Sequence, residues 1–340
     1  METAIEFANV KKQYGPVEAL RGVSFSVGRG EMFGLIGPDG AGKTTAIRAI
    51  CGLLHIEAGS IRVLGKDPVK DHRAITGAVG YLSQRFSLYG DLSVDENIAF
   101  FAEIHGVRDY RGRRDRLLDM TQLTPFRGRL ADQLSGGMKQ KLALACTLVH
   151  EPQLILLDEP TTGVDPVSRR EFWKLLSQFL AAGITILMST PYLDEAERCS
   201  RIVLLHEGRV LALDDPGALR ASMPGTMLEV LVPSPRDTLQ QLRSAGGLET
   251  AQVFGDRLHV WLDHDDAPAA EAAFRKAAER AHIDVTGVRA IVPSLEDVFI
   301  AKLHPTAQSP RGGGPGLHPT AQSPRGGGPG SAESQEATAP

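Results

Sequence analysis

The chain has 340 residues, a length that predicts about two domains, and its 42% apolar and 23% charged residues are typical of a soluble globular protein. The formal net charge of −4 is too small to predict nucleic acid or another polyanion as a partner. No apolar run reaches the roughly 18 residues that cross a bilayer, and residues 1–4 lack the start of a signal peptide, so we expect a cytoplasmic protein. Cys51, Cys146 and Cys199 lie far apart without C-x-x-C spacing, which favours buried thiols over a redox pair or a metal site.

The first 36 residues contain three strand-like runs. Residues 4–10 alternate like an edge strand, residues 20–27 form a second run, and residues 32–36 form a third, apolar one. A glycine-rich stretch with the pattern G-x-x-x-x-G-K-[ST] follows, and a helix-like stretch comes after it, which is the context expected of a phosphate-binding loop. The loop consists of Gly37, Pro38, Asp39, Gly40, Ala41, Gly42, Lys43, Thr44 and Thr45.

The residue types in this loop suit a phosphate. Its glycines let the backbone curl so that N–H groups point inward, where a side chain would clash or block the phosphate. The N-terminus of the following helix adds partial positive charge. Lys43 can reach the β- and γ-phosphates, and the Thr44 hydroxyl can ligate Mg²⁺.

Residues 60–64 and 79–84 form two short strand-like runs, and the second ends on Gln84. A helical region begins at Ser93, because Ser93 and Glu96 have the spacing of a capping box. This region is rich in arginine, which indicates a solvated helix face or, alternatively, contact with anionic lipid or a membrane partner. Its arginines are Arg108, Arg111, Arg113, Arg114, Arg116, Arg127 and Arg129.

Two further motifs carry residue types suited to anions and metals. Ser135 can cap a helix whose first residues, Gly136 and Gly137, leave backbone N–H groups bare for an anion. A run of four apolar residues, typical of a strand buried on both faces, ends in Asp158 and Glu159. Open α/β sheets place their ligand chemistry at such carboxyl ends.

The remaining elements divide into the end of the first unit and a second unit. We expect a helix around residues 170–179, a buried strand at 184–188 and a hairpin at 201–213. From about residue 226 to 302 the order β-α-β-β-α-β indicates a small ferredoxin-like sandwich. Its histidines lack metal-ligand spacing and are expected to be ordinary residues, namely His259, His264 and His282.

A repeat occupies the end of the chain. Residues 303–316 recur identically as residues 317–330, and glycine and proline dominate both copies. Such a segment buries too little apolar surface to offset its conformational entropy, so we expect a flexible tail.

The order and spacing of these motifs resemble the nucleotide-binding subunits of ATP-binding-cassette (ABC) transporters. The glycine-rich loop corresponds to Walker A and Gln84 to the glutamine loop of that family. Residues 134–138 are similar to its signature, residues 154–159 to Walker B with the adjacent glutamate, and residues 163–165 to the D-loop.

This resemblance implies a fold class for most of the chain. Residues 1–220 are expected to form an α/β P-loop NTPase cassette, with a mixed sheet core, a β edge subdomain and a helical insert at about 93–150. Residues 221–302 resemble the small α+β, ferredoxin-like accessory domain of drug-export and ABC-2-type ATPases. Residues 303–340 are expected to be a disordered tail.

The resemblance also implies roles in binding ATP and Mg²⁺. Tyr14 would stack on adenine, and residues 37–45 would hold the phosphates. Thr44 and Asp158 would hold Mg²⁺, with Gln84 near the metal and the attacking water.

Catalysis and assembly follow from the same resemblance. Glu159 would be the general base that polarises the water, with Lys43 and Gln84 in the catalytic centre. Because the family works as a head-to-tail pair, the signature residues would contact the γ-phosphate bound to a second cassette. These residues are Ser135, Gly136 and Gly137. A groove would receive a coupling helix from a transmembrane permease, and its residues are Phe86, Leu88 and Tyr89.

Three positions depart from the family pattern. Asp39 stands where asparagine is usual, and Met138 replaces the usual glutamine of the signature, a variant associated with the ABC-2-type branch. Pro191 stands where the family has a histidine that contacts the γ-phosphate. Proline has neither a side-chain donor nor a backbone N–H, so we expect slow hydrolysis and intact nucleotide binding.

We therefore expect the ATP-binding subunit of an ABC-2-type exporter, located at the inner face of the membrane through its permease partner. The alternative is a hydrolysis-poor nucleotide-binding module, one half of a tandem ATPase with a structural or regulatory role. DNA-repair and chromosome ATPases share the signature but need long coiled-coil insertions, for which the spacing from Lys43 to Ser135 leaves no room. The pairing partner is a second cassette, either identical or different.

Overall fold

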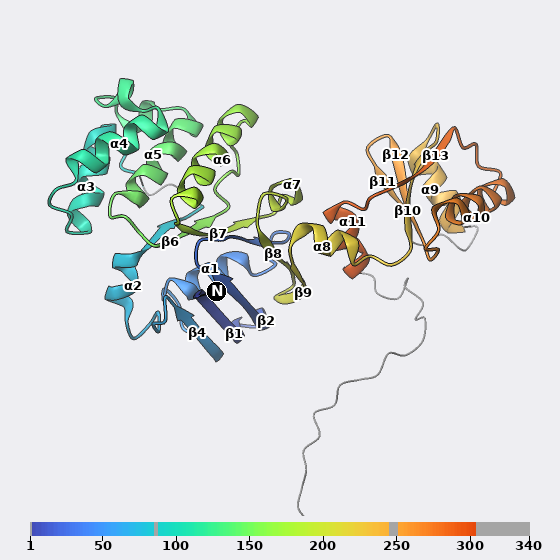
Figure 1. Ribbon diagram of the computed structural model, residues 1–340, viewed down its shortest axis with the longest axis horizontal. Coiled ribbons are helices and arrows are strands. Elements are labelled where there is room, and N and C mark those ends of the chain that lie inside the picture. Colours follow the sequence, from blue (N-terminus) through green and yellow to red (C-terminus); the bar gives the residue numbers. More distant parts are fainter. Residues whose placement is uncertain (1, 85–87, 245–250, 304–340) are drawn as a thin grey trace, which may run out of the picture. The chain divides into compact units, whose positions relative to one another are not determined.

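The computed structural model describes residues 2–84, 88–244 and 251–303 (Figure 1). Phe86 and the repeat from residue 304 onward lie outside the described residues. Leu303, which we expected to begin the tail, is instead the last residue of helix α11 (Leu295–Leu303). Among the described residues, every helix is too short or too polar to cross a membrane.

Six strands form the central sheet, in the order β5-β6-β7-β3-β8-β9. The first five of these strands are parallel, and β9 pairs antiparallel with β8, so the predicted mixed sheet is confirmed. Strands β3, β6 and β7 are buried along their whole length, as expected for continuous apolar runs. The strands are β3 (Met32–Ile36), β5 (Val79–Leu82), β6 (Leu154–Asp158), β7 (Thr185–Thr190), β8 (Arg201–His206) and β9 (Arg209–Asp214).

A second, antiparallel sheet has the order β2-β1-β4, formed by β1 (Thr3–Tyr14), β2 (Val17–Gly28) and β4 (Ala58–Val63). The expectation that residues 4–10 form an edge strand is wrong, because β1 pairs on both sides and is the central strand. Its alternation arises because one face packs into the core through Ile5 and Phe7. The ladder also extends beyond residue 10 and reaches Tyr14, which pairs with Val17.

The helical insert contains three α-helices and two short 3₁₀ turns, and Figure 1 shows α3, α4 and α5 beside one another. The predicted capping box at Ser93 is confirmed, since Ser93 Oγ accepts from Glu96 N and Glu96 Oε2 accepts from Ser93 N. Ion pairs to aspartate or glutamate, which favour the solvated-face interpretation, are formed by Arg113, Arg114, Arg116 and Arg127. The elements are α3 (Val94–Ile104), α4 (Arg111–Thr121), η1 (Thr124–Phe126), η2 (Ala131–Gln133) and α5 (Gly136–Leu148).

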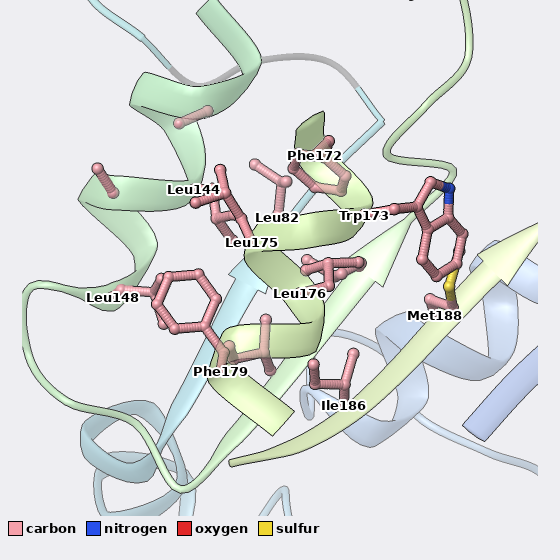
Figure 2. Close-up of a cluster of buried hydrophobic side chains, with 14 of the residues drawn as sticks. Leu82, Leu144, Leu148, Phe172, Trp173, Leu175, Leu176, Phe179, Ile186 and Met188 are labelled. Carbon is pink, nitrogen blue, oxygen red and sulfur yellow. The ribbon is translucent and has the colours of Figure 1, made fainter. Parts of the chain in front are cut away.

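Helix α6 (Pro166–Ala181) joins this insert to the central sheet. It starts earlier than expected because Asp165 caps it and Pro166 suits the first turn. Figure 2 shows Phe172 and Phe179 of α6 among leucines of α5 and side chains of β7, all in one buried cluster. The other helices of this part are α1 (Lys43–Ile50), α2 (His72–Ala78), α7 (Leu193–Ala196) and α8 (Pro216–Ala221).

Residues 226–291 form a separate antiparallel sheet in the order β11-β12-β10-β13, with two helices. The sequence of elements is β-α-β-β-α-β, the topology of a ferredoxin-like unit. A core of its own includes Leu228, Val260 and Phe274. The elements are β10 (Thr226–Leu231), α9 (Pro235–Ser244), β11 (Ala251–Phe254), β12 (Arg257–Leu262), α10 (Ala267–Arg280) and β13 (Gly287–Ile291).

Helix α11 follows this unit and contacts both the cassette core and strand β12. Leu295 and Val298 belong to the same buried cluster as the cassette helices. On the same helix, Asp297 Oδ1 lies 3.0 Å from His259 Nδ1 of strand β12. His259 is therefore buried beside a carboxylate, a partner that its spacing in the sequence gave no means to predict.

Candidate nucleotide site

The predicted phosphate-binding loop joins the end of β3 to the start of α1. A Cβ at Gly37 would lie 2.2 Å from the Leu205 carbonyl oxygen, and one at Gly42 would lie 2.5 Å from that of Ala19. These two glycines are thus required by the close approach of neighbouring backbone. Gly40 has a φ of +79° and no atom within 4 Å of an added Cβ, so its backbone conformation and the open space before it suit a ligand.

Lys43 is the first residue of α1 and is only 4% exposed. Its ammonium donates to the carbonyl oxygens of Gly37, at 2.8 Å, and Pro38, at 3.0 Å. The same Nζ lies 3.0 Å from Glu159 Oε1. These three acceptors match the three donors of the ammonium group, so the lysine is held in place at the floor of the loop.

Both predicted acids follow the apolar run of β6, on the edge of the sheet beside the loop. Asp158 Oδ1 accepts from the Thr44 hydroxyl at 3.1 Å and from the Ser189 hydroxyl at 2.7 Å. Burial raises the pKa of Asp158, and these two hydrogen bonds oppose that shift. Gln84 Nε2 donates to Glu159 Oε2 at 3.1 Å.

A cavity of about 520 Å³ opens over these groups. Tyr14 borders it at the end of β1, with Lys12 Nζ 5.2 Å from the centre of its ring. Sequence reasoning had not placed Val17, Ala19, Thr162 or Tyr192 here, although Thr162 follows the two acids closely and Tyr192 follows Pro191. The lining residues are Tyr14, Val17, Ala19, Asp39, Gly40, Ala41, Gly42, Lys43, Thr44, Thr45, Gln84, Glu159, Thr162, Pro191 and Tyr192.

The signature residues do not line this cavity within the described parts of the chain. Ser135 caps α5 as predicted, because its Oγ accepts from Met138 N at 3.3 Å. No atom lies within 4 Å of a Cβ added at Gly136, whereas one added at Gly137 would be 2.2 Å from Ser168 Oγ. Gly136 therefore faces open space, and Gly137 allows α5 to approach α6.

Comparison with known proteins identifies the family. A model described as ABC transporter matches residues 20–162. The chain is 42% identical over 289 residues to the probable multidrug ABC transporter ATP-binding protein YbhF of Escherichia coli (strain K12), covering 83% of this chain and 49% of YbhF. It is 37% identical over 306 residues to Nod factor export ATP-binding protein I of Paraburkholderia xenovorans (strain LB400), covering 88% of this chain and 96% of that protein. The chain belongs to the ABC transporter ATP-binding proteins.

A solved ABC cassette agrees with this assignment. The dimeric structure of MJ0796, a bacterial ABC transporter cassette, matches with a TM-score of 0.55 and 27% sequence identity, covering 62% of this chain and 98% of that one. The α/β P-loop cassette fold is thus confirmed. The chain spans about half the length of YbhF, at 49%, and nearly all of the Nod factor protein, at 96%.

The residues of the ABC cassette fit ATP with Mg²⁺. A buried cation, Lys43, lies beneath a glycine loop with open space before Gly40, as a phosphate requires. The Thr44 hydroxyl and the Asp158 carboxylate already lie 3.1 Å apart, and oxygen atoms of this kind are the ligands that Mg²⁺ prefers.

Proposed function

We propose that this chain is the ATP-binding subunit of an exporter and an ATPase, which binds MgATP in the cavity over Lys43. One observation carries the proposal: three separate segments of the chain meet at one cavity. Lys43, Thr44, Gln84 and Glu159 line this cavity, and Asp158 lies beside it in contact with Thr44. The names of the relatives, a multidrug ABC transporter ATP-binding protein and a Nod factor export protein, support export. They give no support to the hydrolysis-poor alternative.

The residues at the cavity supply binding and orientation. The Tyr14 ring would stack on the adenine, and the loop N–H groups with Lys43 would hold the phosphates. Thr44 and Asp158 would hold Mg²⁺, and the bound ion would neutralise part of the negative charge of the phosphates. Lys43 then exchanges its contact with Glu159 for phosphate oxygens.

Glu159 would accept the proton of the attacking water. Once Lys43 has turned to the phosphates, its carboxylate still has the amide of Gln84 at 3.1 Å to orient it. The Thr162 hydroxyl, 3.5 Å from Glu159 Oε2, lies on the same side of the cavity.

A second cassette would complete the site. The open space before Gly136 and the capped start of α5 suit a γ-phosphate bound to a partner chain, and the dimeric MJ0796 structure gives a precedent in the fold. A permease would dock near Leu88 and Tyr89, where Tyr89 is 46% exposed against the edge of Phe100. This arrangement would hold the chain at the cytoplasmic face of a membrane.

Lys43→Ala tests the site. The variant should bind a fluorescent ATP analogue roughly 10- to 100-fold more weakly or not at all, because it loses the charge-assisted contacts of the ammonium. Lys70→Ala is the matched control, since that side chain is exposed and pairs only with Asp67 among the ion pairs of the described residues. Equal affinity in the wild type and Lys43→Ala would refute the assignment of the nucleotide site.

Glu159→Gln tests the chemistry separately. Phosphate release should stop while analogue binding persists, because the amide keeps the shape of the carboxylate but cannot accept the proton. Turnover at the wild-type rate would remove Glu159 from the role of base.

A further inference from the structure

Ser189 is a buried hydroxyl that contacts both acids of the candidate site. It lies on β7 directly opposite Asp158 in the parallel ladder, and none of its surface is exposed. Its Oγ donates to Asp158 Oδ1 at 2.7 Å and accepts from the backbone N of Glu159 at 3.0 Å. One side chain thus joins the two residues proposed for the metal and for the attacking water.

The contact with Asp158 differs from that made by Thr44. Both hydroxyls donate to the same oxygen, Oδ1, but Thr44 belongs to the loop and borders the cavity. Ser189 belongs to a fully buried strand and does not reach the cavity lining. The Ser189 hydrogen bond can therefore persist when the Thr44 hydroxyl turns to a metal ion, and it fixes the rotation of the carboxylate.

The contact with Glu159 concerns its backbone. Glu159 has a φ of +48°, in the left-handed region that residues with a Cβ rarely adopt. Its N–H meets both the Ser189 hydroxyl and, at 3.2 Å, the Ser189 carbonyl oxygen. These bonds hold the unusual turn that directs the Glu159 side chain toward Lys43 and Gln84.

We propose that Ser189 is a positioning residue for the metal and water carboxylates, which acts through Asp158 and Glu159 without touching the nucleotide. The inference rests on the proposed function. Removing an outer-shell partner of this kind commonly lowers metal affinity or activity by about 10- to 100-fold.

Ser189→Ala should weaken the metal site selectively. We expect the dissociation constant of Mn²⁺, measured by electron paramagnetic resonance on the full chain loaded with a non-hydrolysable ATP analogue, to rise about tenfold or more. The affinity for the analogue in EDTA should stay within about twofold, because Lys43 and the glycine loop are untouched. At saturating metal, kcat should fall while KM for ATP stays nearly constant. Ser189→Thr keeps the hydroxyl and should recover most of the metal affinity.

Ser177→Ala is the matched control, because its hydroxyl donates to the Trp173 carbonyl of α6, away from the site. If Ser189→Ala binds Mn²⁺ like the wild type, the positioning role is wrong while the proposed function stands. Suppose instead that Ser189→Ala lowers the analogue affinity in EDTA by the same factor as the metal affinity, and also lowers the melting temperature. If Ser189→Thr then gives no recovery, Ser189 has a packing role only. If the wild type itself takes up no nucleotide, the proposed function is wrong, and the inference with it.

Discussion

Pro191 forms part of the wall of the candidate nucleotide cavity, next to Tyr192. The proline ring offers no hydrogen-bond donor to a phosphate. The segment around it is well fixed: Thr190 Oγ1 donates to the buried carboxylate of Glu195 at 2.7 Å and accepts from the backbone N of Tyr192 at 3.1 Å. A side chain introduced at position 191 would therefore start from a defined backbone at the edge of the cavity.

Pro191→His should increase hydrolysis. A preorganised donor on the transition-state charge is typically worth about 10²–10³ in rate, so single-turnover hydrolysis at saturating MgATP should rise by up to that factor. Pro191→Ala frees the backbone in the same way without adding a donor, and it should stay at the wild-type rate. An equal gain in both variants would attribute the effect to backbone freedom, and no gain with histidine would contradict the expectation that this site is slow.

Helix α5 begins with two glycines, Gly136 and Gly137, and the absence of a side chain has a different structural consequence at each. A Cβ at Gly137 would lie 2.4 Å from Ser168 Cβ on α6, whereas a Cβ at Gly136 meets nothing within 4 Å. The signature alone does not distinguish these two positions, because both are glycines at a helix start.

Alanine scanning of the two positions should separate packing from ligand binding. Gly137→Ala should lower the free energy of unfolding by about 1–3 kcal/mol, because it forces α5 away from α6. Gly136→Ala should leave stability within about 0.5 kcal/mol, as surface changes usually do, yet impair turnover by the dimer. Urea denaturation and phosphate release measure the two effects, and a stable Gly137→Ala variant would contradict the packing explanation.

The C-terminal ends of α3 and α5 meet through two histidines. The rings of His105 and His150 are stacked, with centroids 3.9 Å apart and planes at 4°. Burial lowers the pKa of His150 to about 4, assisted by the charge of His105 and opposed by the bond of its Nε2 to the Val79 carbonyl. Burial also lowers the pKa of His105.

Stability should therefore depend on pH through this pair. The unfolded chain takes up a proton near the ordinary histidine pKa of 6.5, but the folded chain does so only near pH 4, so stability is lost as pH falls through that interval. The free energy of unfolding should fall by about 1–3 kcal/mol over this interval. Urea midpoints measured from pH 7 to pH 4.5 should fall less steeply for His150→Gln than for the wild type. His55→Gln, at an exposed position, is the control and should follow the wild-type slope.

At the scale of the whole molecule, α11 connects the cassette core to the sheet of the second unit. Asp297 accepts from the Ser294 backbone N and hydroxyl, and it lies beside His259. Burial alone would raise the pKa of Asp297, but the hydrogen bonds of His259 and Ser294 outweigh it, and the pKa is lowered. The carboxylate is thus stabilised in its charged form at this junction.

Asp297→Ala should loosen that junction. Loss of the buried carboxylate removes the hydrogen-bond partner of His259 and of the first turn of α11. The free energy of unfolding should fall by about 1–3 kcal/mol as a result. Hydrogen exchange should accelerate in α11 and β12, with little change in β6 or β7. Asp256→Ala removes an exposed carboxylate of the same unit and serves as the control. Unchanged exchange in α11 would show that Leu295 and Val298 alone hold the helix.

The sequence predicted the parts of the site that depend on local pattern. The loop places Lys43 and Thr44, and the end of an apolar strand places Asp158 and Glu159, because parallel strands bring their carboxyl ends to one edge. Ser189 could not be predicted in its role, since it depends on the register between β6 and β7. The central position of β1 was missed for a similar reason: alternation reports one buried face and says nothing about how many neighbours a strand has.

The ion pair of Lys43 and Glu159 has a consequence for the order of events in the catalytic cycle. In the structure the two groups neutralise each other at 3.0 Å, and Gln84 occupies the remaining carboxylate oxygen. Under the proposed function, an arriving triphosphate would compete with Glu159 for Lys43, so the affinity for nucleotide would reflect the difference in free energy between two ion pairs of Lys43. In that case the Glu159 carboxylate would be released from Lys43 only when the triphosphate binds, so the nucleotide itself would activate the base for its own hydrolysis.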